Sequence, residues 1–314
     1  MGTGAVGGYF GARLAAAALD VCFVARGENL AALRRRGLLV HTPTGDIVLP
    51  RVWATSDPAE AYPADLVLVA VKAYDTPTAA EALRPAVNPD RSIVLSLQNG
   101  VENEEILARA LGLPPLLLAL TQIGSELIGP GELRYHARGT IVFGEAGGEE
   151  SARVRTLAAA FTQAGIPHHV SRNVRVRLWD KLAWNAGFNA VTTLTGQTVA
   201  EAVDDPDTHR VIADTMAEVA AVAAAQGIAC DPSRIPAVLE ESHTGLGAFK
   251  TSMLQDREHG RRLEYDAING AVLRAAERAR MDAPLNRLLW TLLRRLPTGA
   301  PAAATGLGAR SGYS

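Results

Sequence analysis

The sequence predicts an α/β N-terminal domain of the doubly wound type, followed by an all-α C-terminal domain. The length of 314 residues suits about two domains. The first half of the chain alternates apolar runs of strand length with helical stretches, and a glycine-rich turn opens the first helix. From about Asn173 onward, helical periodicity dominates and β-branched runs are few.

The predicted elements alternate in the first half and are helical in the second. In order, they are a helix over 6–18, a strand over 21–25, a helix over 29–36, a hairpin of 38–42 and 46–50, a strand over 64–72, a helix over 78–83, strands over 92–97, 116–121 and 140–143, and helices over 176–194, 207–226, 232–241 and 263–280. The near-continuous apolar runs are typical of parallel strands covered on both faces. These elements give a first domain at residues 1–172, a second at 173–296, and a tail at 297–314 that its Gly, Ala and Pro content predicts to be disordered.

The composition excludes several classes of function. A net charge of −2 gives no indication of a nucleic-acid partner. Cys22 and Cys230 lie far apart without CxxC spacing, which argues against a disulfide framework or a zinc site and fits a reducing compartment. The N-terminus shows no secretory signal, and no run of about 18 apolar residues suggests a membrane span. We therefore expect a cytoplasmic protein without a metal site.

The N-terminal glycines match the GxGxxG fingerprint of dinucleotide-binding domains. The motif consists of Gly2, Thr3, Gly4, Ala5, Val6 and Gly7 and opens the first predicted helix. Glycines there allow a tight turn and close approach of a pyrophosphate to the helix N-terminus. The predicted strand over 21–25 supplies the next part of a βαβ unit, which favours a Rossmann-like domain over a merely glycine-rich terminus. Because this fingerprint normally follows a strand, we expect about five strand residues before Met1 in the natural product.

Arg26 favours NADP as the dinucleotide. An acidic residue at the end of the second strand would bind the ribose 2′-hydroxyl of NAD, whereas an arginine suits a 2′-phosphate. This strand ends in Val24-Ala25-Arg26, and Glu28 comes two residues later.

Two polar side chains stand at the carboxyl ends of the predicted strands, where doubly wound sheets bind ligands. Lys72 ends the run LVAVK, and Asn99 follows SIVLSLQ. Lys72 could pair with a phosphate or a carboxylate, and Asn99 could bond near a nicotinamide. The sequence contains three lysines among 31 basic residues, which makes each of them conspicuous.

The segment RLWDKLAWNAGFNAVTTL carries a polar stripe among aromatic residues. Lys181, Asn185 and Asn189 are spaced i, i+4, i+8 and fall within an arc of about 80° on an α-helix. Trp184 and Phe188 beside them indicate that the helix is largely covered, so these polar groups would need partners. A substrate with hydroxyl, keto and carboxylate groups would supply such partners. A lysine in such a place could donate a proton to a developing alkoxide.

A second polar cluster follows near the end of the helical half. Ser252 and Asp256 share one face of a predicted helix. Glu264 stands at the start of the next predicted helix, where a carboxylate also suits the helix N-terminus.

Taken together, these segments resemble the ketopantoate reductase family. The resemblance covers Gly2 to about Leu296 and rests on five motifs in the same order, namely GTGAVGGYFGARLA, LVAVKAYDT, LQNGVEN, LWDKLAWNAGFN and KTSMLQDREHGRRLEYDAING. It implies an NADP-binding Rossmann domain and a helical domain similar to the C-terminal domain of 6-phosphogluconate dehydrogenase. The implied reaction is NADPH-dependent reduction of 2-dehydropantoate to (R)-pantoate, a step of pantothenate and coenzyme A biosynthesis.

The resemblance also implies roles for single residues of the helical domain. Lys181 matches the proton donor of the family. Asn185 and Asn189 match ligands of a substrate hydroxyl, and Ser252 matches the group that binds the substrate carboxylate. Glu264 matches the acid that orients the ligands in the closed site, with substrate and cofactor both in reach.

In the N-terminal domain, Lys72 and Asn99 match cleft residues that touch cofactor and substrate, and Arg26 matches the partner of the 2′-phosphate. Two features of the helical domain depart from the family pattern. Ala190 replaces a frequent proline, and no asparagine follows shortly after Gly196. These departures bear on the choice of substrate more than on the chemistry.

Two other functions stay open from the sequence. One is an NADP-dependent reductase of another 2-oxo acid or an imine, and the other is a non-catalytic NADP-binding redox sensor. The lysine stripe favours an enzyme, because a sensor needs no proton donor. In either enzyme, the partner is a small 2-oxo acid or a related molecule, and a homodimer is left open.

Overall fold

The structure divides into two compact units. In the computed structural model, which describes residues 1–297, the first unit is Met1–Trp179 and the second begins at Asp180. The division falls inside helix α6 (Val174–Trp184), slightly later than the expected boundary between residues 172 and 173. The tail predicted over 297–314 lies, except for Pro297, outside the described residues.

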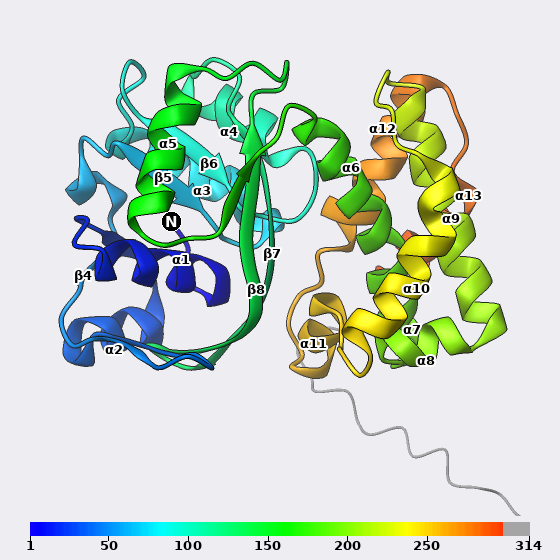
Figure 1. The fold of residues 1–314 in the computed structure, drawn as a ribbon, viewed down its shortest axis with the longest axis horizontal. Coiled ribbons are helices and arrows are strands. Elements are labelled where there is room, and N and C mark those ends of the chain that lie inside the picture. Colours follow the sequence, from blue (N-terminus) through cyan, green and yellow to red (C-terminus); the bar gives the residue numbers. More distant parts are fainter. Residues whose placement is uncertain (298–314) are drawn as a thin grey trace, which may run out of the picture. The chain divides into compact units, whose positions relative to one another are not determined.

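The first unit is the α/β unit (Figure 1). Its helices before α6 are α1 (Ala5–Ala16), α2 (Gly27–Arg36), α3 (Thr76–Leu83), α4 (Asn103–Leu111) and α5 (Ala152–Gln163). Its strands are β1 (Cys22–Val24), β2 (Leu38–His41), β3 (Ile47–Leu49), β4 (Trp53–Thr55), β5 (Leu66–Val69), β6 (Ile93–Ser96), β7 (Leu118–Gly129), β8 (Glu132–Gly144) and β9 (His168–Val170). The predicted helices and the β2–β3 hairpin are confirmed, whereas α4, α5, β4 and β9 were not among the predicted elements.

The strands pair in both directions, and a second antiparallel pair adds to the hairpin that the sequence predicted. The pairs β1–β4, β5–β6, β2–β8 and β8–β9 are parallel, but β2–β3 and β7–β8 are antiparallel. Strands β7 and β8 form a long ribbon, of which the sequence predicted only the outer ends (Figure 1). The reason is the two-residue turn Pro130-Gly131, where Gly131 has φ +71°, because so short a connection can join only antiparallel strands.

The first three residues connect two pairs of strands. The backbone N–H groups of Gly2 and Thr3 donate to the carbonyl of Val24 in β1, at 3.1 and 3.2 Å. Toward β5, the Met1 amine donates to the carbonyl of Leu68 at 2.8 Å, and the N–H of Ala70 donates to the carbonyl of Met1 at 2.9 Å. The turn that opens α1 is thereby fixed between β1 and β5. The strand expected before Met1 stays a prediction.

Aromatic side chains form much of the core of the first unit. Phe10, Phe143 and Phe161 are fully buried, and the last two meet edge to face with their ring centroids 5.6 Å apart. Tyr9 of α1 stacks on Tyr135 of β8 at 4.5 Å, so the helix that begins at the glycine turn is held against the sheet. Burial of this apolar surface therefore fixes the position of the α1 N-terminus.

The second unit is helical, as predicted. After α6, its helices are α7 (Ala190–Thr195), α8 (Val199–Asp204), α9 (Pro206–Ala224), α10 (Ile235–Leu246), α11 (Ser252–Glu258), α12 (Ala271–Ala279) and α13 (Pro284–Leu293). Two of the predicted helices contain a π turn, at Asn185–Asn189 and at Asp266–Gly270. Residue patterns predict helix but not this widening, in which backbone hydrogen bonds run from i to i+5.

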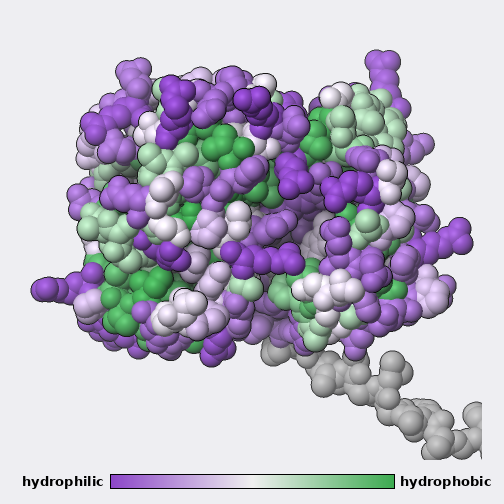
Figure 2. Space-filling model, in the orientation of Figure 1, coloured by the Kyte–Doolittle hydropathy of each residue, from purple (hydrophilic) through white to green (hydrophobic). Residues whose placement is uncertain are grey.

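The face of the molecule in Figure 2 is mostly hydrophilic, with apolar residues in separate patches. In the described part of the chain, no helix is both long enough and apolar enough to cross a bilayer.

Candidate active site

The glycine turn of the first unit leaves the N-terminus of α1 open. A Cβ at Gly2, which has φ +92°, would lie 2.7 Å from the backbone nitrogen of Val71, and a Cβ at Gly7 would collide with the carbonyl oxygen of Gly2. A Cβ at Gly4 would instead meet no atom of residues 1–297 within 4 Å, and no side chain caps the helix there. Free N–H groups and the positive end of the helix dipole thus face open space, which fits a pyrophosphate.

Arg26 stands beside this turn at the start of α2. It is exposed, and it follows β1 as the N-cap residue of α2. Asn29, which the sequence analysis did not single out, joins α2 to the glycine turn: its amide nitrogen donates to the carbonyl of Thr3 at 2.6 Å, and its oxygen accepts from the N–H of Gly131 at 2.7 Å. These bonds join segments 26 and 102 residues apart, so no local residue pattern could have identified them.

Lys72 and Asn99 lie beyond the same edge of the β5–β6 pair. These strands are parallel, and Val69 pairs with Ser96. Lys72 and Asn99 each come three residues after that pair, so both follow the carboxyl end of their strand at equal distance along the chain. Each is half-buried. The structure therefore brings their backbones to one edge of the sheet, as the sequence predicted.

Lys181 lies on α6, a helix that is buried on most sides. Trp179 and Leu182 are 5% and 1% exposed, and Lys181 itself is half-buried. Trp184 stacks on Phe188 with ring centroids 4.7 Å apart, and its indole N–H donates to the hydroxyl of Ser242 at 2.9 Å. The predicted cover of this helix is confirmed, and rigid aromatic packing fixes the segment that carries the lysine.

Asn185 and Asn189 meet at the two ends of the first π turn. They are 6% and 1% exposed, and the amide nitrogen of Asn189 donates to the oxygen of Asn185 at 3.5 Å. This leaves the amide nitrogen of Asn185 and the oxygen of Asn189 without a hydrogen-bond partner among the described residues. Unpaired buried polar atoms are costly. The pair thus offers one donor and one acceptor, the complement of a hydroxyl group.

Ser252 begins helix α11 and is exposed, whereas Asp256 on the same helix is buried and bonded to Arg261 at 2.7 Å. The N-cap residue Thr251 is fully buried, and its hydroxyl bonds to that of Thr192 at 2.8 Å. Thr192 in turn donates to the carbonyl of Phe188 at 2.7 Å. These two hydroxyls, which the sequence analysis missed, connect the start of α11 to the first π turn.

Glu264 lies two residues before the second π turn and is 6% exposed. In that turn, the amide nitrogen of Asn269 donates to the carbonyl of Ala186 at 3.1 Å, so the two π turns are hydrogen-bonded to each other. The same nitrogen donates to the side-chain amide oxygen of Asn286 in α13 at 3.1 Å. Turns of this kind occur frequently at functional sites. Here they bring together the segments that carry Asn185, Asn189 and Glu264.

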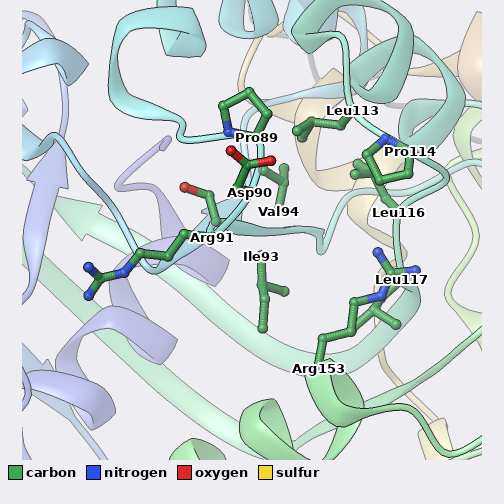
Figure 3. Close-up of a pocket in the computed structure, with 11 residues that line it drawn as sticks. Pro89, Asp90, Arg91, Ile93, Val94, Leu113, Pro114, Leu116, Leu117 and Arg153 are labelled. Carbon is green, nitrogen blue, oxygen red and sulfur yellow. The ribbon is translucent and has the colours of Figure 1, made fainter.

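A cavity of about 180 Å³ lies at the opposite, amino end of β6 (Figure 3). Apolar side chains such as Ile93 and Leu116 line it, with Arg91 and Arg153 beside them. Both guanidinium groups are bound to carboxylates, Arg91 to Asp65 and Arg153 to Glu145. Both positive charges are therefore already paired with carboxylates. The carboxyl edge of β5 and β6, with Lys72 and Asn99, remains the better candidate for a ligand site in the first unit.

Comparison with known families covers both units. The family profile described as "Ketopantoate reductase PanE/ApbA" matches residues 1–148, and the profile of its C-terminal domain matches residues 173–296. The 2-dehydropantoate 2-reductase of Archaeoglobus fulgidus is 34% identical over 300 residues, which are 95% of this chain and 97% of that protein. The enzyme of the same name from Halobacterium salinarum is 32% identical, with 93% of this chain and 96% of that protein covered.

Solved structures of the same family have a similar fold. A 2-dehydropantoate 2-reductase from Geobacter metallireducens has a TM-score of 0.88 at 34% identity and covers 94% of this chain and 97% of its own. A PanE/ApbA family ketopantoate reductase from Ralstonia eutropha JMP134 has a TM-score of 0.86 at 36% identity, with 94% and 96% covered. D-Mandelate dehydrogenase with NADH has a TM-score of 0.84 at 24% identity, a likeness of fold alone.

Proposed function

Because the chain belongs to the ketopantoate reductase family, we propose that it reduces 2-dehydropantoate to (R)-pantoate with NADPH. Membership makes it an oxidoreductase acting on a CH–OH group, with a small keto acid as substrate and a nicotinamide dinucleotide as cofactor. It also favours an enzyme over a redox sensor. The finer assignments below, and a cytoplasmic place in pantothenate and coenzyme A biosynthesis, belong to this proposal.

The first unit would hold the cofactor. The uncapped N-terminus of α1 and the open space at Gly4 fit its pyrophosphate. Arg26 is exposed and makes no ion pair with another described residue, so its charge is available to a 2′-phosphate. When bound, NADPH supplies the hydride. Lys72 and Asn99 would contact cofactor and substrate from the carboxyl edge of β5 and β6.

The second unit would hold the substrate and its proton donor. The donor and acceptor that Asn185 and Asn189 leave free fit the substrate hydroxyl, and Ser252 at the N-terminus of α11 fits the carboxylate. Lys181 would donate a proton to the ketone oxygen as it becomes an alkoxide. Glu264, carboxylate-bearing and buried, would orient these groups.

The observation that carries this proposal is the unsatisfied amide pair in the first π turn. Two polar atoms in a buried helix would destabilise the unit unless a ligand paired with them. A ligand whose hydroxyl lies close to a ketone would hydrogen-bond to both amides through the hydroxyl. Its ketone would be the group that Lys181 protonates.

A stopped-flow assay of NADPH oxidation tests the proposal. We expect turnover with 2-dehydropantoate and a clear preference for NADPH over NADH, because Arg26 favours the extra phosphate. Arg26→Ala should raise the KM for NADPH and leave NADH use almost unchanged. No oxidation with 2-dehydropantoate would refute the substrate, and equal losses with both cofactors would refute the role of Arg26.

Ala190 and the lack of an asparagine shortly after Gly196 favour a second candidate, a reductase of another 2-oxo acid. A panel of 2-oxo acids with and without a 4-hydroxyl group separates the two. A higher kcat/KM for an acid without that hydroxyl would select the second candidate.

A further inference from the structure

Four buried polar side chains lie behind the loops that carry Lys72 and Asn99. They are Ser96, Gln98, Thr76 and Asn103, and their exposures are 0%, 6%, 0% and 4%. We propose that they form a positioning network, called the Thr76 network below, that sets Lys72 and Asn99 for catalysis. The inference rests on the proposed function, in which these two residues contact cofactor and substrate.

The network is hydrogen-bonded from end to end. The amide nitrogen of Gln98 donates to the carbonyl of Val71 at 2.9 Å and to the hydroxyl of Thr76 at 2.7 Å. The hydroxyl of Thr76 donates to the amide oxygen of Asn103 at 2.8 Å. The amide nitrogen of Asn103 donates to the carbonyl of Asn99 at 2.8 Å.

Both ends of the network are peptide groups next to the proposed contact residues. The carbonyl of Val71 belongs to the peptide bond that leads into Lys72. The carbonyl of Asn99 belongs to the peptide bond between Asn99 and Gly100, which has φ +102°. Holding these two carbonyls sets the direction in which each residue leaves its strand. Strands β5 and β6 bring the two loops to one edge of the sheet, but the strand pairing ends at Val69 and Ser96. The network joins the loops beyond that point.

The chemistry of the ends fixes the direction of every bond. A carbonyl oxygen can only accept, so the amide nitrogens of Gln98 and Asn103 must face Val71 and Asn99. The other nitrogen–hydrogen of Gln98 then points at Thr76, and the oxygen of Asn103 is left to accept from it. The central group must accept one hydrogen bond and donate another, which a hydroxyl can do and a methyl group cannot. The oxygen of Gln98 accepts from Ser96 at 3.2 Å, which completes the network.

Stability alone does not account for such a network. Buried polar groups must be desolvated, and an apolar filling of the same shape is often as stable. What the polar groups add is a fixed geometry, and a misplacement of about 1 Å at a reacting group costs up to about 10²-fold in rate. Thr76, Gln98 and Asn103 act through Lys72 and Asn99 and are therefore positioning residues.

Thr76→Val tests the proposal, because it keeps the shape of the side chain and removes the hydroxyl. We expect kcat/KM for 2-dehydropantoate to fall at least about tenfold and the Kd for NADPH to rise, while Thr76→Ser stays close to the parent protein. Thr215→Val is the matched control: Thr215 is also fully buried with its hydroxyl bonded at 2.6 Å, but it lies on α9 in the second unit. We expect it to lower the melting temperature without a comparable loss of kcat/KM.

A double-mutant cycle separates positioning from a general loss of structure. We measure Thr76→Val, Lys72→Ala and the double variant, and repeat the cycle with Asn99→Ala. If Thr76 acts through these residues, the loss in each double variant is clearly smaller than the product of the single losses. Losses that multiply in both cycles would overturn the proposal, as would full activity of Thr76→Val.

If Thr76→Val fails to fold, Asn103→Ala serves in the same cycles, because it cuts the bond to Asn99 and leaves that from Gln98 to Val71. If the parent protein does not reduce 2-dehydropantoate, the proposed substrate fails while this inference stays testable. The Kd for NADPH, measured by titration with the fluorescence of the reduced cofactor as the signal, then replaces kcat/KM in the comparison of Thr76→Val with Thr76→Ser. An unchanged Kd in Thr76→Val would overturn the inference in that case.

Discussion

At the scale of single residues, Lys181 is set apart by its surroundings. The chain makes nearly all of its positive charge from arginine, and it has three lysines among 31 basic residues. Lys250 is 46% exposed and bonds to Glu258, as a surface lysine would. Lys181 instead lies on a helix packed with aromatic side chains and one turn before the Asn185–Asn189 pair. An amine can give up its proton, which a guanidinium does not do at neutral pH.

Replacing Lys181 with alanine should therefore lower kcat by about 10²–10⁴-fold, because general acid catalysis contributes about that much. The KM for 2-dehydropantoate should change less, since the asparagine pair remains. Steady-state kinetics at saturating NADPH give both numbers. Lys250→Ala is the control and should keep kcat within about threefold. Near-normal turnover in Lys181→Ala would mean that another group protonates the product.

At the scale of elements, the two π turns are among the features that the sequence did not predict. The glycine turn, the helices that carry the candidate residues and the strand ends at Lys72 and Asn99 all have local signals, because each depends on a short residue pattern. A π turn depends on packing from a distant segment: the nitrogen of Asn269 reaches the carbonyl of Ala186, 83 residues away in the sequence. The bond from Gln98 to Val71 escaped prediction for the same reason. Helix α13, with Leu285, Leu289 and Leu293 at helical spacing, did carry a local signal that the prediction passed over.

Asn269→Leu should destabilise the second unit by about 2 kcal/mol or more, because it leaves the buried backbone carbonyl of Ala186 and the side-chain amide oxygen of Asn286 without their donor. Urea unfolding followed by tryptophan fluorescence measures the change. Gln226→Leu makes the same kind of substitution at an exposed position in this unit and should shift stability by less than about 0.5 kcal/mol. Equal effects of the two substitutions would show that the bond between the π turns contributes nothing.

At the scale of the whole molecule, each unit has its own buried core, and the first also has an ion pair between buried Glu145 and half-buried Arg153. Glu145 is almost fully buried, and the guanidinium of Arg153 donates to both of its oxygens at 2.8 and 2.6 Å. Arg153, with help from Ser151, holds the pKa of Glu145 below its ordinary value despite burial. A carboxyl of this kind stabilises the fold above its unfolded pKa, and the effect is lost as pH falls through the folded pKa.

The difference in melting temperature between the parent protein and Glu145→Gln should consequently depend on pH. At pH 7 we expect the variant to melt at least about 2 °C lower, and the gap should shrink as the pH falls well below 4.5, the ordinary pKa of this carboxyl. Circular dichroism melts at several pH values measure this gap. Glu150→Gln, at an exposed site nearby, should show little difference at any pH. A gap that is constant from pH 7 to pH 3 would contradict the assignment.

The first π turn has a consequence for how this segment tolerates changes in chain length. A π turn holds one residue more than the α-helical turn in the same place, so loss of a single amino acid, such as Gly187, would restore an ordinary α-helical ladder. The helix downstream would keep nearly its present orientation, because a π turn accommodates its extra residue within about one turn. Asn189 would stand three residues after Asn185 instead of four, so the contact between the two amides, which spans four residues in the intact chain, depends on the number of residues between them.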